Sequence, residues 1–196
     1  MSIMKSEDNF TKDCNPLLSK ERVKLWKARD IKGSEIEVGE FLYGLVRFLK
    51  PRIVLETGCY KGDTSIAIAK ALKKNGTGML HTCDINEELA KFTKNRLNKE
   101  VAGYGEIHYT YGTELIERFK EKIDLAFVDS GYGYGEREEE INLLIKYLHP
   151  GKIIAIHDTA PQHLGIYKVA NKLDLPKLYF NTPRGFTLIQ LPAHNG

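Results

Sequence analysis

Residues 52–70, RIVLETGCYKGDTSIAIAK, constrain the fold more than any other part of the chain. They begin with a β-favouring apolar run without a polar break, as expected of a strand covered on both faces in a parallel sheet. Gly58 and Gly62 bracket the turn that follows, where glycine permits a positive φ or the close approach of a ligand. Asp63 or Thr64 is placed to cap the helical pattern after it. We therefore expect a strand, a tight loop and a helix whose free N–H groups can face a ligand.

Composition indicates ordinary globular material. The chain has 196 residues, of which 42% are hydrophobic and 28% charged, and a formal charge of +3. Basic and acidic residues alternate in KERVKLWKARD and EREEE, which is typical of solvated helix faces and disfavours nucleic acid as substrate. Cys14, Cys59 and Cys83 have no C-x-x-C spacing, so a reducing compartment is favoured. We find no secretion signal and no run long enough to span a bilayer, and expect a cytoplasmic protein.

The N-terminal part differs in character from the rest. We predict a polar, partly helical extension over residues 1–34 and a single domain over residues 35–196. Residues 16–32 contain enough apolar side chains to pack as a helix. Ser34 and Glu37 then form a capping-box pattern at the start of a second, amphipathic helix that leads into the opening strand.

Strand and helix patterns alternate through the remainder. The predicted strands are 79–83, 107–111, 123–128 and 152–156, followed by 177–180 and 185–191 as an antiparallel hairpin. The predicted helices are 86–99, 114–120, 136–148 and 164–173. This order predicts an α/β fold, a three-layer, Rossmann-like, doubly wound and mostly parallel sheet with a C-terminal antiparallel hairpin.

Acidic residues end several of the predicted strands. Glu56, Asp84 and Asp129 each follow an apolar strand, and His157 and Asp158 follow the last parallel one. The carboxyl ends of neighbouring parallel strands meet at the crevice where ligands bind. A carboxylate such as Asp84 can accept hydrogen bonds from both hydroxyls of a ribose there. The alternative is that Asp84 only caps the helix that follows it.

The spacing Glu56-x-Gly58-x-x-x-Gly62 differs from the dinucleotide fingerprint G-x-G-x-x-G and resembles motif I of the class I S-adenosylmethionine-dependent methyltransferases. A purely structural loop between strand and helix is the alternative. Residues 123–159, IDLAFVDSGYGYGEREEEINLLIKYLHPGKIIAIHDT, are similar in spacing to the bacterial small-molecule O-methyltransferases related to the catechol-type family. The resemblance covers about residues 35–190.

The resemblance implies S-adenosylmethionine as methyl donor. Glu56 would then hold or hydrate the donor's amino group, backbone N–H groups from Tyr60 to Thr64 would take its carboxylate, and Asp84 would bind its ribose. Tyr132 or Tyr134 would approach the sulfonium as a cation–π partner, or serve only as a lid. The implied cofactor-binding residues are Glu56, Gly58, Cys59, Tyr60, Gly62, Thr64, Asp84, Ile85, Gly112, Thr113 and Asp129.

The acceptor must lose a proton, and the resemblance implies Asp129, His157 and Asp158 as catalytic residues. Either His157 acts as a base of near-neutral pKa, or Asp129 and Asp158 hold Mg²⁺. Three departures bear on this: the family's Asp-x-His after the fourth strand is replaced here by Gly131-Tyr132, its second glycine by Lys152 and its asparagine by Thr159. His157 as a mere strand-end residue stays open.

The function expected is methyl transfer to a hydroxyl of a small molecule or sugar, with a homodimer as a plausible assembly. A protein that binds the cofactor without transferring methyl, as an assembly partner, is the alternative. A nicotinamide oxidoreductase is disfavoured by the glycine spacing, and VDSGYGYG is not the Asn/Asp-Pro-Pro-aromatic tetrad of nucleic-acid N-methyltransferases. The acceptor itself is not specified by the sequence.

Overall fold

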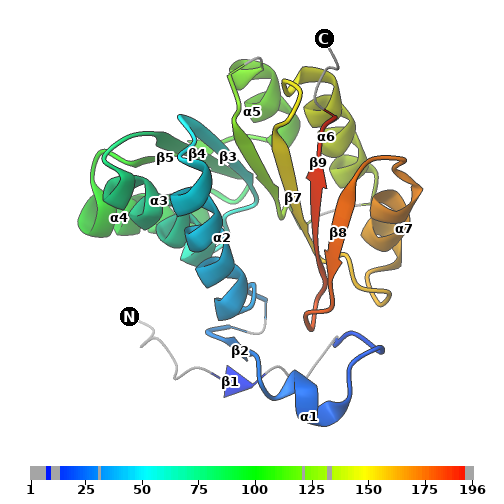
Figure 1. Ribbon diagram of the computed structural model, residues 1–196. Coiled ribbons are helices and arrows are strands. Elements are labelled where there is room, and N and C mark those ends of the chain that lie inside the picture. The colour runs from blue at the N-terminus through cyan, green and yellow to red at the C-terminus, as the bar shows by residue number, and fades with distance from the viewer. Residues whose placement is uncertain (1–7, 10–13, 31, 121, 132–133, 193–196) are drawn as a thin grey trace.

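A seven-stranded sheet in the order β5-β4-β3-β6-β7-β9-β8 forms the centre of the molecule (Figure 1). The computed structural model describes residues 8–9, 14–30, 32–120, 122–131 and 134–192. The strands of this sheet are β3 Ile53–Thr57, β4 Met79–Asp84, β5 Gly105–Tyr109, β6 Leu125–Val128, β7 Ile153–His157, β8 Lys177–Phe180 and β9 Phe186–Gln190. The helices around it are α2 Ile36–Leu49, α3 Asp63–Asn75, α4 Glu87–Val101, α5 Gly112–Phe119, α6 Tyr134–Tyr147 and α7 Leu164–Lys172.

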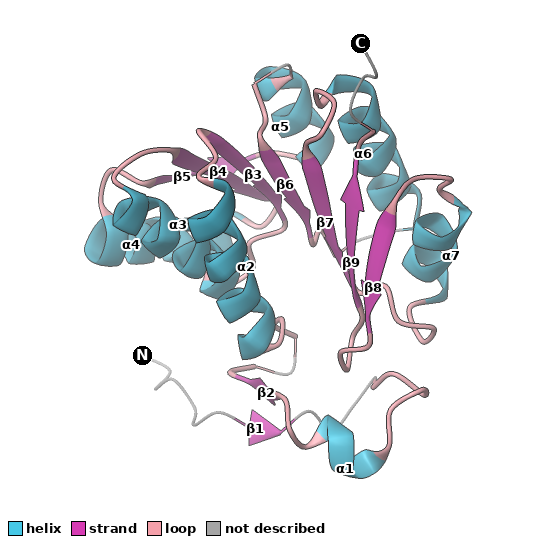
Figure 2. Ribbon diagram, viewed as in Figure 1, coloured by secondary structure: helices cyan, strands magenta, loops and turns pink. Residues whose placement is uncertain are grey.

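The topology confirms the predicted fold class. Strands β5, β4, β3, β6 and β7 are parallel, β9 runs antiparallel to β7, and β8 pairs with β9 as the predicted hairpin. Helices α2, α3 and α4 cover one face of the sheet, and α5, α6 and α7 cover the other (Figure 2). The chain builds outward in one direction from β3 and in the other from β6. A doubly wound sheet offers its ligand crevice at this switch point, beyond the carboxyl ends of β3 and β6.

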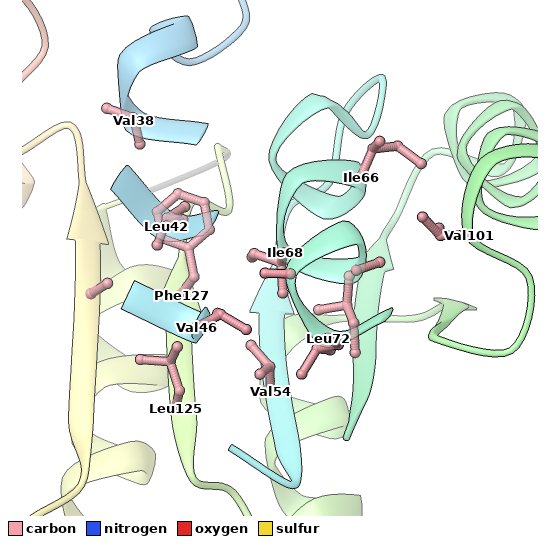
Figure 3. Packing of buried hydrophobic residues seen from close by; sticks show 14 of the residues in the cluster. Val38, Leu42, Val46, Val54, Ile66, Ile68, Leu72, Val101, Leu125 and Phe127 are labelled. Carbon is pink, nitrogen blue, oxygen red and sulfur yellow. The ribbon is translucent and has the colours of Figure 1, made fainter. Parts of the chain in front are cut away.

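Two apolar clusters, one on each face, hold the layers together. Figure 3 shows the first, in which Val38, Leu42 and Val46 of α2 pack toward Leu125 and Phe127 of β6. The spacing of four residues along α2 places these three side chains on one face of the helix. Burying side chains of this size stabilises the fold by roughly 1.5–3 kcal/mol each.

The helix starts differ from the predicted caps. The predicted capping box is wrong, because the N-cap residue of α2 is Glu35, which makes no side-chain cap bond. Ser34 Oγ donates instead to Asp129 Oδ2 (2.8 Å). The Glu37 side chain accepts from the Lys27 backbone N–H. Helix α3 likewise begins without a side-chain cap, since Gly62 occupies the N-cap position at φ +77°. The Ser34 and Glu37 side chains bind tertiary partners in place of the helix start.

The predicted helix over residues 16–32 is wrong. Among the described residues of this segment only one turn forms, α1 Lys20–Val23, and β2 Lys27–Ala28 then pairs with β1 Asp8–Asn9. Leu17 and Leu25 remain exposed, so the apolar residues of this segment do not share one helical face. The division at residue 34 stays a prediction. No helix in the described part of the chain is long and apolar enough to cross a membrane.

The segment before α5 shifts toward the N-terminus. Strand β5 occupies residues 105–109 in place of the predicted 107–111, and α5 begins at Gly112. Gly112 packs against α6 and β3, where an added Cβ would lie 1.9 Å from Glu140 Oε1 and 2.9 Å from Thr57 Cγ2. Glycine permits this close packing at the first residue of α5, which begins two residues before the predicted start.

Candidate active site

A cleft of about 550 Å³ opens at the carboxyl ends of β3, β4, β6 and β7. A second cavity of about 190 Å³ lies beside it and shares Gly58, Asp84 and Gly131 as lining residues. Of the predicted residues, the large cleft is lined by Gly58, Cys59, Tyr60, Thr64, Asp84, Asp129, His157 and Asp158. The smaller one adds Ile85, Gly112 and Thr113. Together they have the size of small-ligand sites.

Asp84 joins the two loops that border the cleft. Its Oδ2 accepts from the Tyr60 backbone N–H (2.9 Å), and its Oδ1 accepts from the Asn86 N–H (2.8 Å). The alternative role of helix cap belongs to Asn86, whose side chain accepts from the N–H groups of Glu88 and Leu89. Since a carboxylate has about four acceptor positions, Asp84 retains capacity for hydroxyl donors from the cleft.

The loop between β3 and α3 has features of a ligand-binding loop. Gly58 is at φ +79°, and an added Cβ would lie 2.5 Å from the Asp129 carbonyl, so the chain segments meet closely there. Asp63 and Thr64, in the first turn of α3, line the cleft, and the helix start is uncapped by side chains. The N-terminus of a helix with free N–H groups favours an anion such as a carboxylate.

Glu56 lies behind this loop and not in the cleft. Its side chain is fully buried, Thr64 Oγ1 donates to Oε1 (2.6 Å), and Ser65 Oγ donates to Oε2. Burial raises the pKa of Glu56. Glu56 therefore fixes the first turn of α3, and its role in holding or hydrating the donor's amino group stays a prediction. Gly62 also lies outside the cleft lining, packed on Thr93 of α4.

His157 stands in a cage of carboxylates. Its Nδ1 lies 3.0 Å from Asp129 Oδ1, and its Nε2 lies 2.6 Å from Glu35 Oε2. Burial lowers the pKa of His157, but Asp129, Glu35 and Asp158 outweigh it and raise the pKa well above its ordinary value. Because both nitrogens are engaged and the ring is 1% exposed, His157 has no lone pair to offer as a base. The engaged nitrogens and the raised pKa do not support the expected near-neutral base at His157.

Two arginines complete this cluster. Arg137 Nη2 donates to Asp158 Oδ2 (3.1 Å) and approaches Asp129 Oδ1 (3.4 Å), while Arg184 Nε donates to Asp158 Oδ1 (2.6 Å). Burial raises the pKa of Asp158, but His157, Arg137 and Arg184 outweigh it and hold the pKa far below its usual range. We define the acid network as Glu35, Asp129, Arg137, His157, Asp158 and Arg184. With His157 charged, its three anions balance three cations.

Magnesium does not fit the Asp129 and Asp158 pair. Their four carboxylate oxygens already accept from Ser34, His157, Arg137 and Arg184. The Arg137 guanidinium spans the two acids, so a divalent cation bound to both would face it at close range. Mg²⁺ needs free oxygen ligands, so it could bind to both acids only by displacing the donors that these oxygens already have.

His163, at the start of α7, has the surroundings that His157 lacks. Its ring lines the cleft, and its buried Nε2 lies 3.6 Å from Asp158 Oδ1, beyond hydrogen-bond distance. Burial lowers the pKa of His163, and the charges of Arg184, His157 and Arg137 lower it further against the opposing effect of Asp158. It is therefore a neutral imidazole at neutral pH, on the wall of the cleft.

Comparison with known proteins agrees with this geometry. Residues 55–159 match the profile of a methyltransferase domain family, which is more than half of the chain. The chain belongs to this methyltransferase domain family. No curated protein sequence gives a significant match.

Solved methyltransferases share the fold of this domain. The O-methyltransferase TomG from Streptomyces achromogenes, solved with SAM, has 21% identity, covers 80% of each chain and gives a TM-score of 0.66. The O-methyltransferase from Bacillus cereus, solved with SAH, has 17% identity, covers 83% of this chain and 84% of its own, and gives 0.69. An rRNA methylase from Streptococcus thermophilus has 18% identity, with 80% and 95% covered, and gives 0.64. This class I fold thus serves different acceptors.

Sequence reasoning missed several residues of the methyltransferase domain site: Ser34, Glu35, Arg137, His163 and Arg184. Arg137 and Glu140 belong to the EREEE run that was assigned to a solvated face, yet they are 4% and 2% exposed. The signal was present, because Arg137 precedes the buried Ile141 by four residues and so shares its helix face. Tyr132 and the side chain of Tyr134 lie outside the described residues.

The acid network predicts a pH range of maximal stability for the methyltransferase domain. His157 has a raised pKa, so its contribution is complete below its unfolded value of about 6.5 and is lost as pH rises through the folded pKa. Asp158 and Glu35 have lowered pKa values. The stability that they contribute is therefore complete above their unfolded values, about 4.3 at most, and is lost as pH falls through the folded pKa values. We expect Tm to be highest between these limits, and His157→Gln to flatten its alkaline decline. An unchanged alkaline decline in calorimetry would contradict this.

Proposed function

We propose that this protein is an S-adenosylmethionine-dependent methyltransferase that acts on a hydroxyl of a small molecule. The observation that carries the proposal is the cleft itself, where the uncapped start of α3 and the Asp84 carboxylate meet the acid network. Membership of the methyltransferase domain family supports it, and so do the SAM and SAH bound to TomG and the Bacillus cereus enzyme.

The residues of the cleft fit the donor. N–H groups in the first turn of α3 would receive its carboxylate, Asp84 would accept its ribose hydroxyls, and the smaller cavity at Ile85 and Thr113 would take the adenine. When bound, the donor supplies a methyl group activated on a sulfonium. The chain's own contribution is then alignment, which can be worth about 7–11 kcal/mol of the barrier.

His163 is the base that we assign to the acceptor hydroxyl. Asp158 lies 3.6 Å from Nε2 without a hydrogen bond, but its negative charge favours the tautomer with the proton on Nε2. We assign the Nδ1 lone pair to the substrate's proton. Asp158 then stabilises the imidazolium that forms. Asp129, His157 and Asp158 remain assigned to catalysis as positioning residues, and no step requires Mg²⁺. A homodimer and a cytoplasmic location remain predictions.

Titration calorimetry with SAM and SAH tests the donor site. We expect wild-type binding, unchanged by Mg²⁺ or EDTA, and a loss of about 10- to 100-fold in Asp84→Asn, since a hydrogen bond to a charged group contributes about 1.5–3 kcal/mol. Asp174→Asn, on the exposed turn after α7, is the matched control and should bind as the wild type does.

The two compounds separate the possible outcomes. No binding of either SAM or SAH would reject the proposal. Binding without turnover on any member of a panel of phenols, catechols and sugars would favour the alternative of a cofactor-binding partner protein. Turnover on one member would identify the acceptor class.

A further inference from the structure

A second cluster of ligating side chains lies away from the cleft, on β4 and β5. His81 precedes Asp84 by three residues, roughly 10 Å along the strand. In the parallel pairing of these strands His81 stands opposite Glu106, and His108 follows Glu106 by two residues. All three side chains therefore project from the same face of the sheet. One donor atom from each lies within 4.8 Å of the others.

The spacing of these atoms matches a tetrahedral site. His81 Nδ1 lies 3.2 Å from His108 Nε2 and 3.5 Å from Glu106 Oε2. Zinc bound at about 2.0–2.2 Å to nitrogen and oxygen places neighbouring ligand atoms about 3.3–3.6 Å apart in a tetrahedron. The two separations from His81 Nδ1 are thus already close to the edges of a zinc tetrahedron, and the third lies within 4.8 Å.

The rings are held in place before any ion binds. The His81 ring stacks on Phe119 with 4.0 Å between centroids, and His108 meets Phe119 edge-on at 5.9 Å. Burial lowers the pKa values of His81 and His108, which favours the neutral form that binds metals. Glu106 is mostly exposed and leaves a side open from which an ion can enter.

We propose that His81, Glu106 and His108 form a Zn²⁺ site with a fourth position open to water. Two imidazole nitrogens and one carboxylate suit zinc and exclude Mg²⁺, which prefers oxygen ligands. Bound zinc joins the edge strand β5 to β4 and stabilises the fold by mass action. This site is independent of the proposed methyl transfer.

The contact between Arg118 and His108 gives the proposal a specific test. Its Nη1 lies 3.2 Å from His108 Nδ1 and can only donate, which fixes the His108 proton on Nε2 in the free protein. Zinc on Nε2 moves that proton to Nδ1, where it opposes the Arg118 donor, and this exposed side chain must swing away. Arg118→Gln replaces a donor with an oxygen that can accept from Nδ1–H, so it should tighten zinc binding about 10-fold.

Calorimetry with ZnCl₂ at pH 7.5 on the full chain tests the site, and Co²⁺ absorption tests its geometry. We expect micromolar binding, tetrahedral Co²⁺ bands, a zinc-dependent rise in Tm and at least about 10-fold weaker binding in His108→Ala. His149→Ala, an exposed histidine after α6, is the control and should not change binding. His108 is half-buried, so His108→Ala should fold, and circular dichroism checks this. The second variant is His81→Phe, which keeps an aromatic ring stacked on Phe119. Undiminished zinc binding in both variants, or no binding at 100-fold excess, would overturn the proposal.

Discussion

Replacing Arg137 with methionine is expected to lower the free energy of unfolding by about 3–5 kcal/mol, the usual loss when one partner of a buried ion pair is removed. Arg137 is 4% exposed and contacts both Asp158 and Asp129, and its Nη1 donates to the His157 carbonyl (3.0 Å). Methionine has nearly the same length but no charge, so two acids remain with one cation fewer. A typical domain has only about 5–15 kcal/mol in total.

Urea unfolding followed by circular dichroism measures this effect. Arg52→Met is the matched control, because the Arg52 side chain is exposed, and a change within about 0.5 kcal/mol is expected. The double variant Arg137→Met/Asp158→Asn should lose less than the sum of the two single variants, since it removes the unbalanced charge. A loss below 1 kcal/mol in Arg137→Met would mean that the network does not depend on this arginine.

Substitution of His163 by glutamine should lower kcat by about 10²–10⁴-fold, which is what a positioned acid–base group contributes. The donor affinity should stay within about threefold, because no donor contact is assigned to His163. In the wild type, kcat should rise with pH through a pKa below the ordinary value, as a base must be deprotonated to act. The variant should lack this dependence.

The assay for His163 follows SAH release with an acceptor taken from the panel of phenols, catechols and sugars. His149→Gln is the matched control and should keep the wild-type kcat and pH profile. If His163→Gln retains kcat within threefold, or if its kcat still rises with pH as in the wild type, then another group removes the proton. Asp129 would be tested next, because its carboxylate also lines the cleft.

The local sequence pattern predicted most of the fold. The strand, glycine turn and helix at residues 52–70, and the alternation after it, predicted the doubly wound sheet and its terminal hairpin, because burial on both faces requires apolar runs of this kind. The acids at strand ends predicted the edge at which the site lies. Asp84 and Asp129 line the cleft because parallel strands bring their carboxyl ends together.

What the sequence could not give is which side chains pair once the strands are assembled. Ser34 and Glu35 precede α2 and read as local helix-start residues, yet they bind Asp129 and His157, 95 and 122 positions away. The same is true of Arg184, whose contact with Asp158 requires the β8–β9 hairpin to fold back on β7. Charge balance in a buried cluster is a property of all its members at once. The sequence by itself therefore determined the sheet and the edge that holds the site. The tertiary structure decided that carboxylates surround His157 and raise its pKa, and that His163 lines the cleft with a lowered pKa.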